Sequence, residues 1–250
     1  MARSTGALAL VAVMTSPAGA QEASTPPIYS EKRLTLEVAD VDRDTVPPGT
    51  PAAFEAAFGQ APRNEAVREI DGSTFTFVPL ALIPLAGEKV ALVSTGRSAC
   101  TGHPCSGINA VHYLREVRAR YEVEGEWSHV GATGTFGHPA LRWGWSDAIA
   151  DDPVLYTEGG GVWQGYACSR ASLTALTPAG PLEIASIPVF FSNEGAMGEG
   201  DTSLEGTITS VEKGRSFTVT YRGSRTFREH YVRGEDGHYE VRGGTKVPSC

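Results

Sequence analysis

Alternation of apolar and polar residues is the main pattern of the chain from residue 73 onward. A period of two places every second side chain on the same face of a strand, so this pattern is typical of strands with one buried face. Turn-forming Gly, Pro, Asn and Asp residues separate the alternating stretches. The expected strands cover residues 34–40, 73–83, 88–95, 108–116, 119–126, 153–157, 162–168, 171–177, 181–191, 204–211, 215–222, 225–233 and 237–243.

Strands that follow one another without helices between them pair antiparallel with their neighbours. The pattern therefore predicts a mainly β fold of antiparallel meanders, arranged as a sandwich or an open barrel. A short helical segment is expected over residues 50–58, where Thr50 can cap the helix, Pro51 suits its first position and Gly59 ends it. A second helical turn is expected over residues 63–70.

Two segments of the chain resemble each other. Residues 112–125 (HYLREVRARYEVEG) and residues 230–243 (HYVRGEDGHYEVRG) share seven of fourteen positions. This similarity indicates either an internal duplication or two independent hairpins, because Tyr, Val and Gly suit strands and turns in any hairpin. A duplication would give propeller-like repeats of about 60 residues as the alternative fold. The expected repeats cover residues 88–150, 152–201 and 204–250.

The first twenty residues have the pattern of a secretory signal peptide. Arg3 precedes an apolar run over residues 6–15, and Ala18-Gly19-Ala20 suits a signal peptidase. The run has about half of the ~20 apolar residues that cross a membrane, so no membrane insertion is expected. We expect export, to the periplasm of a Gram-negative cell or otherwise by secretion. A flexible lead-in over residues 21–33 would then precede a single all-β domain over residues 34–250.

The net charge of the chain argues against two classes of binding partner, nucleic acids and anionic membranes. The chain carries a formal net charge of −8, and loss of Arg3 with the signal peptide makes it one unit more negative. No cluster of Lys and Arg stands out in the sequence, so the electrostatic signature of a nucleic-acid binder is lacking. The acidic chain would also be repelled by anionic membrane surfaces.

The four cysteines are expected to form disulfides, because an even number of cysteines in an exported protein favours a disulfide framework. The short loop with Gly102 and Pro104 favours a Cys100–Cys105 pair. The remaining pair is then Cys168 with Cys250, which would tie down the chain end. The alternative is a metal site formed by Cys100, His103 and Cys105, although the other two cysteines match no zinc pattern.

Aromatic residues gather in the long connection over residues 127–147 (WSHVGATGTFGHPALRWGWSD) and just after it. Long connections in compact domains are often functional, and aromatic side chains can stack on a sugar ring or an apolar ligand. The sequence thus predicts a site for a carbohydrate or a small apolar ligand. Its expected residues are Trp143, Trp145, Trp163, Tyr166 and His138. The alternative is that the tryptophans close the end of the sheet core.

Standard catalytic patterns are lacking. There is no Gly-x-Ser-x-Gly elbow and no His-Glu-x-x-His pair, and residues 158–161 (EGGG) suggest a loop at a strand end. We therefore expect a non-enzymatic binding or interaction module without a cofactor, and we name no catalytic residue. Two alternatives remain open: a hydrolase of cell-envelope polymer and a purely structural envelope component. The hydrolase would use loop carboxylates such as Asp147, Asp151, Asp152 and Glu158.

Overall fold

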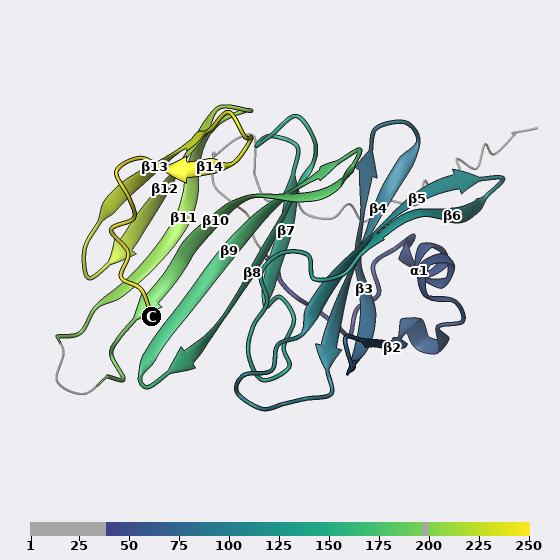
Figure 1. Ribbon diagram of the computed structural model, residues 1–250, viewed down its shortest axis with the longest axis horizontal. Coiled ribbons are helices and arrows are strands. Elements are labelled where there is room, and N and C mark those ends of the chain that lie inside the picture. Colours follow the sequence, from purple (N-terminus) through teal and green to yellow (C-terminus); the bar gives the residue numbers. More distant parts are fainter. Residues whose placement is uncertain (1–38, 197–199) are drawn as a thin grey trace, which may run out of the picture.

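The computed structural model describes residues 39–196 and 200–250, which form two antiparallel sheets and one short α-helix (Figure 1). The prediction of a mainly β fold of antiparallel meanders is confirmed for this part of the chain. The expected signal peptide (1–20), the lead-in (21–33) and most of the expected strand 34–40 lie outside the described residues. No helix in the two described ranges is long and apolar enough to cross a membrane.

The smaller sheet is a meander of five strands in chain order. Its strands are β2 (Ala66–Ile70), β3 (Ser73–Leu85), β4 (Lys89–Ser98), β5 (Ile108–Val117) and β6 (Arg120–Trp127). Helix α1 (Thr50–Phe58) lies against this sheet (Figure 1). The ring of Phe58 contacts Phe54 at 4.5 Å and Phe77 of β3 at 5.1 Å between centroids. This apolar contact, more than helix propensity, holds so short a helix in place.

The larger sheet has the strand order β1-β7-β8-β9-β10-β11-β12-β13-β14 and is curled (Figure 1). Its strands are β1 (Ala39–Asp40), β7 (Arg142–Ser146), β8 (Val154–Trp163), β9 (Tyr166–Thr177), β10 (Gly180–Ser192), β11 (Ser203–Glu212), β12 (Ser216–Gly223), β13 (Phe227–Arg233) and β14 (Tyr239–Val241). Except for β1, each strand pairs with its neighbour in sequence. This local connectivity is what short turns between alternating stretches produce.

The two sheets pack face to face through one apolar cluster. Ile83, Val93 and Val111 of the smaller sheet meet Trp143 and Leu155 of the larger sheet in that cluster. A second cluster lies under helix α1, and a third fills the curl of the larger sheet. The sandwich arrangement therefore involves only one end of the larger sheet, and the curl of its other strands encloses a core of its own.

Both expected disulfides are present. Cys100 is bonded to Cys105 and Cys168 to Cys250, with Cα–Cα distances of 5.9 Å and 6.4 Å. The buried carboxylate of Glu229 also holds the C-terminal segment, because it accepts hydrogen bonds from the Thr245 hydroxyl at 3.0 Å and from the Lys246 amide. The last residues are therefore tied to the body of the fold at two points.

The helix at residues 50–58 is confirmed and ends at Gly59, but its cap differs from the expectation. Gly49 occupies the N-cap position, and the hydroxyl of Thr50 donates to the Pro47 carbonyl instead of capping the helix. The second helical turn is wrong beyond residue 64. A 3-10 turn covers Pro62–Asn64, and strand β2 follows.

Strand β2 forms because it pairs with β3 through a tight turn. Asp71 and Gly72 both have positive φ, as a two-residue hairpin turn requires. This Asp-Gly signal marks the hairpin that the sequence analysis missed. The pairing with β3 overrides the helical tendency of residues 66–70.

The expected loop at residues 158–161 is also wrong. These residues lie inside β8, which continues to Trp163 and then turns at Gln164 and Gly165 into β9. The glycines are needed because other backbone segments approach β8 closely. A Cβ on Gly159 would lie 2.1 Å from the carbonyl carbon of Thr133. Glycine inside a strand marks such an approach.

The two similar segments form hairpins in different sheets, β5–β6 and β13–β14. Their registers differ: Tyr113 pairs with Gly125, whereas the equivalent Tyr231 pairs with Val241. His112 is buried, whereas the equivalent His230 is exposed. A duplication stays a prediction, because two independently formed hairpins would also share these residue types.

His112 is a buried polar group beneath helix α1. Its ring is 1% exposed and contacts Phe58 edge-on at 4.9 Å, and neither ring nitrogen makes a hydrogen bond within the described residues. Burial lowers the pKa of the His112 imidazole, and Arg68 adds to the effect, while the Glu126 carboxylate 3.5 Å from Nε2 opposes it. The neutral imidazole is therefore the form that the fold favours.

Stability should fall in mild acid because of His112. The unfolded chain takes up a proton near pH 6.5 and the folded chain only at lower pH, so the free energy of unfolding decreases as pH falls below about 6.5, by at most about 1.4 kcal/mol per pH unit. Urea denaturation between pH 7.5 and 5 should show a shallower pH dependence for His112→Leu than for the wild type. The control His230→Gln, at the exposed equivalent position, should keep the wild-type dependence. Parallel curves for wild type and His112→Leu would contradict this role.

Candidate ligand-binding groove

The five residues of the expected ligand site do not lie together. Trp143 is 7% exposed and belongs to the cluster between the sheets. Trp145 is half-buried and packs against the same cluster and against the core of the curl. Tyr166 packs against Phe191 at 6.3 Å and borders the core of the curl. These three side chains contribute to the core, which is the role of the tryptophans in the alternative interpretation.

Trp163 and His138 lie on a different surface, at the end of β8. Trp163 is 40% exposed, and the imidazole of His103 meets its ring edge-on at 5.7 Å. The same imidazole meets the exposed ring of Phe136 at 5.0 Å. His103 is held there because its Nε2 lies 2.7 Å from the carbonyl oxygen of Val162. The Cys100–Cys105 loop thus places His103 against Trp163 and Phe136.

A groove of about 540 Å³ adjoins Trp163. We call it the Trp163 groove. Its apolar walls come from Trp163, Pro188, Phe190 and Pro248, and the last residues of the chain close one side of it. A second, smaller hollow of about 310 Å³ continues from it and is lined by Phe136, His138, Leu141 and Val162 among others. The two hollows share Gly160, Cys168, Ser169 and Phe190.

Polar groups within the Trp163 groove are few and fixed. The guanidinium of Arg170 donates through Nε and Nη2 to the hydroxyl of Ser186, at 3.1 Å and 2.9 Å. The hydroxyl of Ser172 donates to the carboxylate of Glu183 at 2.6 Å. An apolar hollow with a small number of oriented polar groups is the usual form of a small-molecule site.

One wall of the groove comes from the connection between β6 and β7, residues 128–141. Gly131, Ala132 and Thr133 of this connection line the groove. The amide of Ala132 donates to the hydroxyl of Thr157 at 2.8 Å. The connection can approach β8 so closely because Gly159 has no side chain.

Buried Asn109 fixes the same connection from the other sheet. Its side-chain amide donates to the carbonyls of Val130 at 3.1 Å and Ala132 at 3.2 Å. Its side-chain carbonyl accepts from the amide of Ala140 at 3.3 Å. The groove wall is therefore held between both sheets and is preformed.

Of the residues at this surface, His138 was expected in the ligand site and His103 only in the alternative metal site, whereas Arg170 and Phe190 were not predicted. His103 belongs to the cysteine loop, and Arg170 and Phe190 belong to ordinary strands. The curl of the sheet, the two disulfides and long-range hydrogen bonds, such as that from the Gly107 amide to the His138 carbonyl, bring these distant segments together.

The carboxylates considered for a hydrolase lie outside the two hollows at Trp163. Glu158 is 8% exposed and accepts hydrogen bonds from the Tyr156 hydroxyl at 2.8 Å and from Arg142 at 3.3 Å. Asp151 and Asp152 precede strand β8, so at about 3.3 Å per residue they lie roughly 20 Å along the chain from Glu158. None of the four carboxylates lines the Trp163 groove or the smaller hollow.

Both cysteines of the alternative metal site are engaged in a disulfide with each other. Within residues 39–196 and 200–250, no group of three or more His, Cys, Asp and Glu side chains is placed to hold a metal ion. The chemistry that the groove offers is thus contact with aromatic rings together with hydrogen bonds to a guanidinium, hydroxyls and a carboxylate.

Replacement of Gly159 by alanine should displace the groove wall. The added methyl group would overlap the backbone of Thr133, so Gly159→Ala should lower the free energy of unfolding by about 2 kcal/mol, measured by urea denaturation. Gly102→Ala is the matched control, since its nearest atoms would be 3.6 Å away, and it should change stability by less than about 0.5 kcal/mol. Equal stability of the two variants would show that Thr133 does not rest on β8.

Comparison with family models, with curated proteins and with solved structures finds no match for this chain.

Proposed function

We propose that the protein is an exported, non-enzymatic binding module that takes a carbohydrate in the Trp163 groove. The observation that carries the proposal is the groove itself, where an exposed tryptophan stands beside fixed hydrogen-bonding side chains. The two disulfides are compatible with export, because disulfides persist in oxidising compartments.

A sugar matches this combination of surfaces better than a purely apolar molecule does. One face of a pyranose ring presents C–H groups that can stack on an indole, and its hydroxyls need donors and acceptors at the rim. Trp163 supplies the flat apolar surface, while Arg170 and Glu183 supply a donor and an acceptor on the same groove. A small apolar ligand would leave these polar groups without partners from the ligand, and that would weaken binding.

The contacts of the carboxylates favour binding over hydrolysis. Glycoside hydrolysis uses two carboxyl groups held about 5–9.5 Å apart across the bond that is cleaved. Glu183 is the acidic side chain that lines the Trp163 groove, and it accepts a hydrogen bond from Ser172. A purely structural envelope component would have no need of a preformed groove of this size.

Trp163→Ala should weaken saccharide binding at least about tenfold, or about 1.4 kcal/mol, because the stacking surface is removed. A glycan array identifies the saccharide, and calorimetry measures the affinity. Trp163→Phe should retain part of the affinity, since a smaller ring remains. Val67→Ala, which trims another exposed apolar side chain in the smaller sheet, should bind like the wild type.

Fluorescence reports on the same residue. Trp163 is the most exposed of the four tryptophans, so iodide quenching should act mainly on its emission and should decrease when the saccharide is bound. Wild-type affinity in Trp163→Ala would remove the groove as the site. Binding of the neutral apolar probe N-phenyl-1-naphthylamine without any saccharide would replace the carbohydrate by an apolar ligand.

A further inference from the structure

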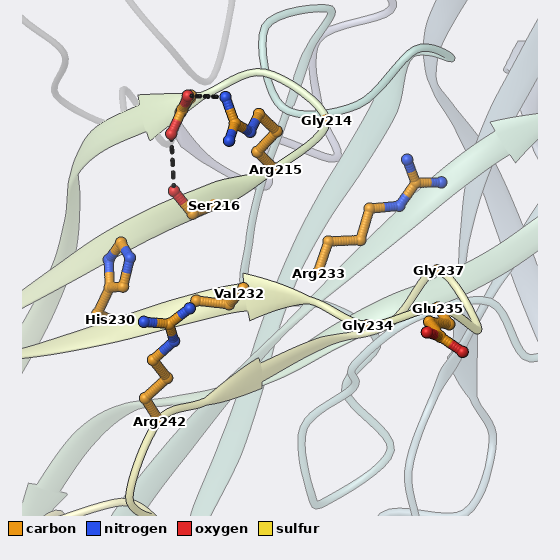
Figure 2. Close-up of a pocket in the computed structure, with 11 residues that line it drawn as sticks. Gly214, Arg215, Ser216, His230, Val232, Arg233, Gly234, Glu235, Gly237 and Arg242 are labelled. Atoms are coloured by element: carbon orange, nitrogen blue, oxygen red, sulfur yellow. Dashed lines mark hydrogen bonds and ion pairs between the residues drawn. The ribbon is translucent and has the colours of Figure 1, made fainter.

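Another hollow, of about 570 Å³, lies on the larger sheet at the turns that join β11 to β12 and β13 to β14 (Figure 2). It shares no lining residue with the Trp163 groove. We call it the arginine hollow. Its cationic and hydrogen-bonding side chains are Arg215, Ser216, His230, Arg233 and Arg242.

Cationic side chains outnumber acidic ones in the arginine hollow, although the whole chain carries a net charge of −8. Its two acidic residues are Glu212 and Glu235. Glu212 is already engaged, because its carboxylate pairs with Arg215 at 2.9 Å and accepts from the Ser216 hydroxyl at 3.5 Å. The charged side chains of the lining thus carry a formal charge of +1, and Asp151 lies outside the lining at 3.9 Å from Arg233.

Arg242 is the cation that lacks a partner. Arg233 lies 3.9 Å from Asp151, but the guanidinium of Arg242 has no hydrogen bond or ion pair with any side chain in the described ranges. Figure 2 shows this guanidinium extending across β13 toward the imidazole of His230. A guanidinium offers a fork of five donors that fits a carboxylate or a phosphate.

The neighbouring groups are held in place to complete a donor set. The amide of Arg242 donates to the carbonyl of His230 at 3.0 Å, so the two residues lie on adjacent chain segments. Nδ1 of His230 lies 3.3 Å from the Thr218 hydroxyl. When that hydroxyl donates, the ring proton is on Nε2 and is free for a ligand. The hydroxyl of Ser216 lines the same hollow from β12.

We propose that the arginine hollow binds the oxyanion group of a small ligand, a carboxylate or a phosphate. Arg242 and His230 are its direct ligands. The lining has no aromatic ring apart from the imidazole of His230, so it lacks the stacking platforms on which single-stranded nucleic acids bind. This site is independent of the Trp163 groove and rests on different residues.

Calorimetry with two probes tests the arginine hollow. The probes are inorganic phosphate and citrate, a carboxylate without a sugar ring, and neutral glycerol serves as the blank. Arg242→Gln should weaken binding of the anions at least tenfold, because the unpaired guanidinium is the main contact. Arg120→Gln is the matched control, since it removes the same charge from an exposed position on β6 and should change the affinity less than twofold.

The binding results either support or overturn the anion site. Binding of phosphate alone, of citrate alone or of both supports the site, and the pattern identifies the source of the anion. Failure of both probes to bind overturns it. An equal loss in Arg242→Gln and Arg120→Gln also overturns it, because diffuse attraction would then explain the binding. Circular dichroism verifies that the variants fold, and Trp163→Ala should leave the anion affinity unchanged, so the two proposals fail separately.

Discussion

The side chain of Asn109 links the two sheets, because it binds the connection that joins them. It is fully buried, and both of its polar atoms are satisfied by the connection over residues 128–141, with Thr95 as a further donor at 3.3 Å to its carbonyl oxygen. A buried amide without these partners would cost about 1–3 kcal/mol. The connection also makes backbone hydrogen bonds to β8 of the larger sheet, from Thr135 to Gly160 and from Leu141 to Glu158. One segment therefore sets how the sheets meet.

The shape of the Trp163 groove depends on this link between Asn109 and the connection. Asn109 fixes the connection, and the glycines of β8 have no side chain to keep it away. Residues 131–133 therefore pack against the strand and form a wall of the groove. The Cys168–Cys250 disulfide sets the opposite wall by fixing the C-terminal residues. The Cys100–Cys105 loop adds His103 to the edge of Trp163. The disulfides are thus part of the groove as well as of the stability of the fold.

The sequence was sufficient where the structure depends on local pattern. Alternation located most strands, Gly59 ended the helix, and the even number of cysteines and the short loop near Cys100 indicated the disulfide pairs. It was insufficient where distant segments meet. The pairing of β8 with β9 places residues 158–161 inside a strand instead of the expected loop, and the pairing of β2 with β3 replaces an expected helical turn. Burial of Trp143 depends on sheet packing, which no short window of sequence contains.

The two proposed sites differ in the same way. The Trp163 groove is assembled from the connection between the sheets, three strands and the chain end, so its shape depends on the whole fold. The arginine hollow is built from two adjacent turns and the strands that they join, and neighbouring strand pairing alone brings Arg242 beside His230. Loss of the hydrogen bonds of Asn109 would therefore disturb the Trp163 groove far more than the arginine hollow.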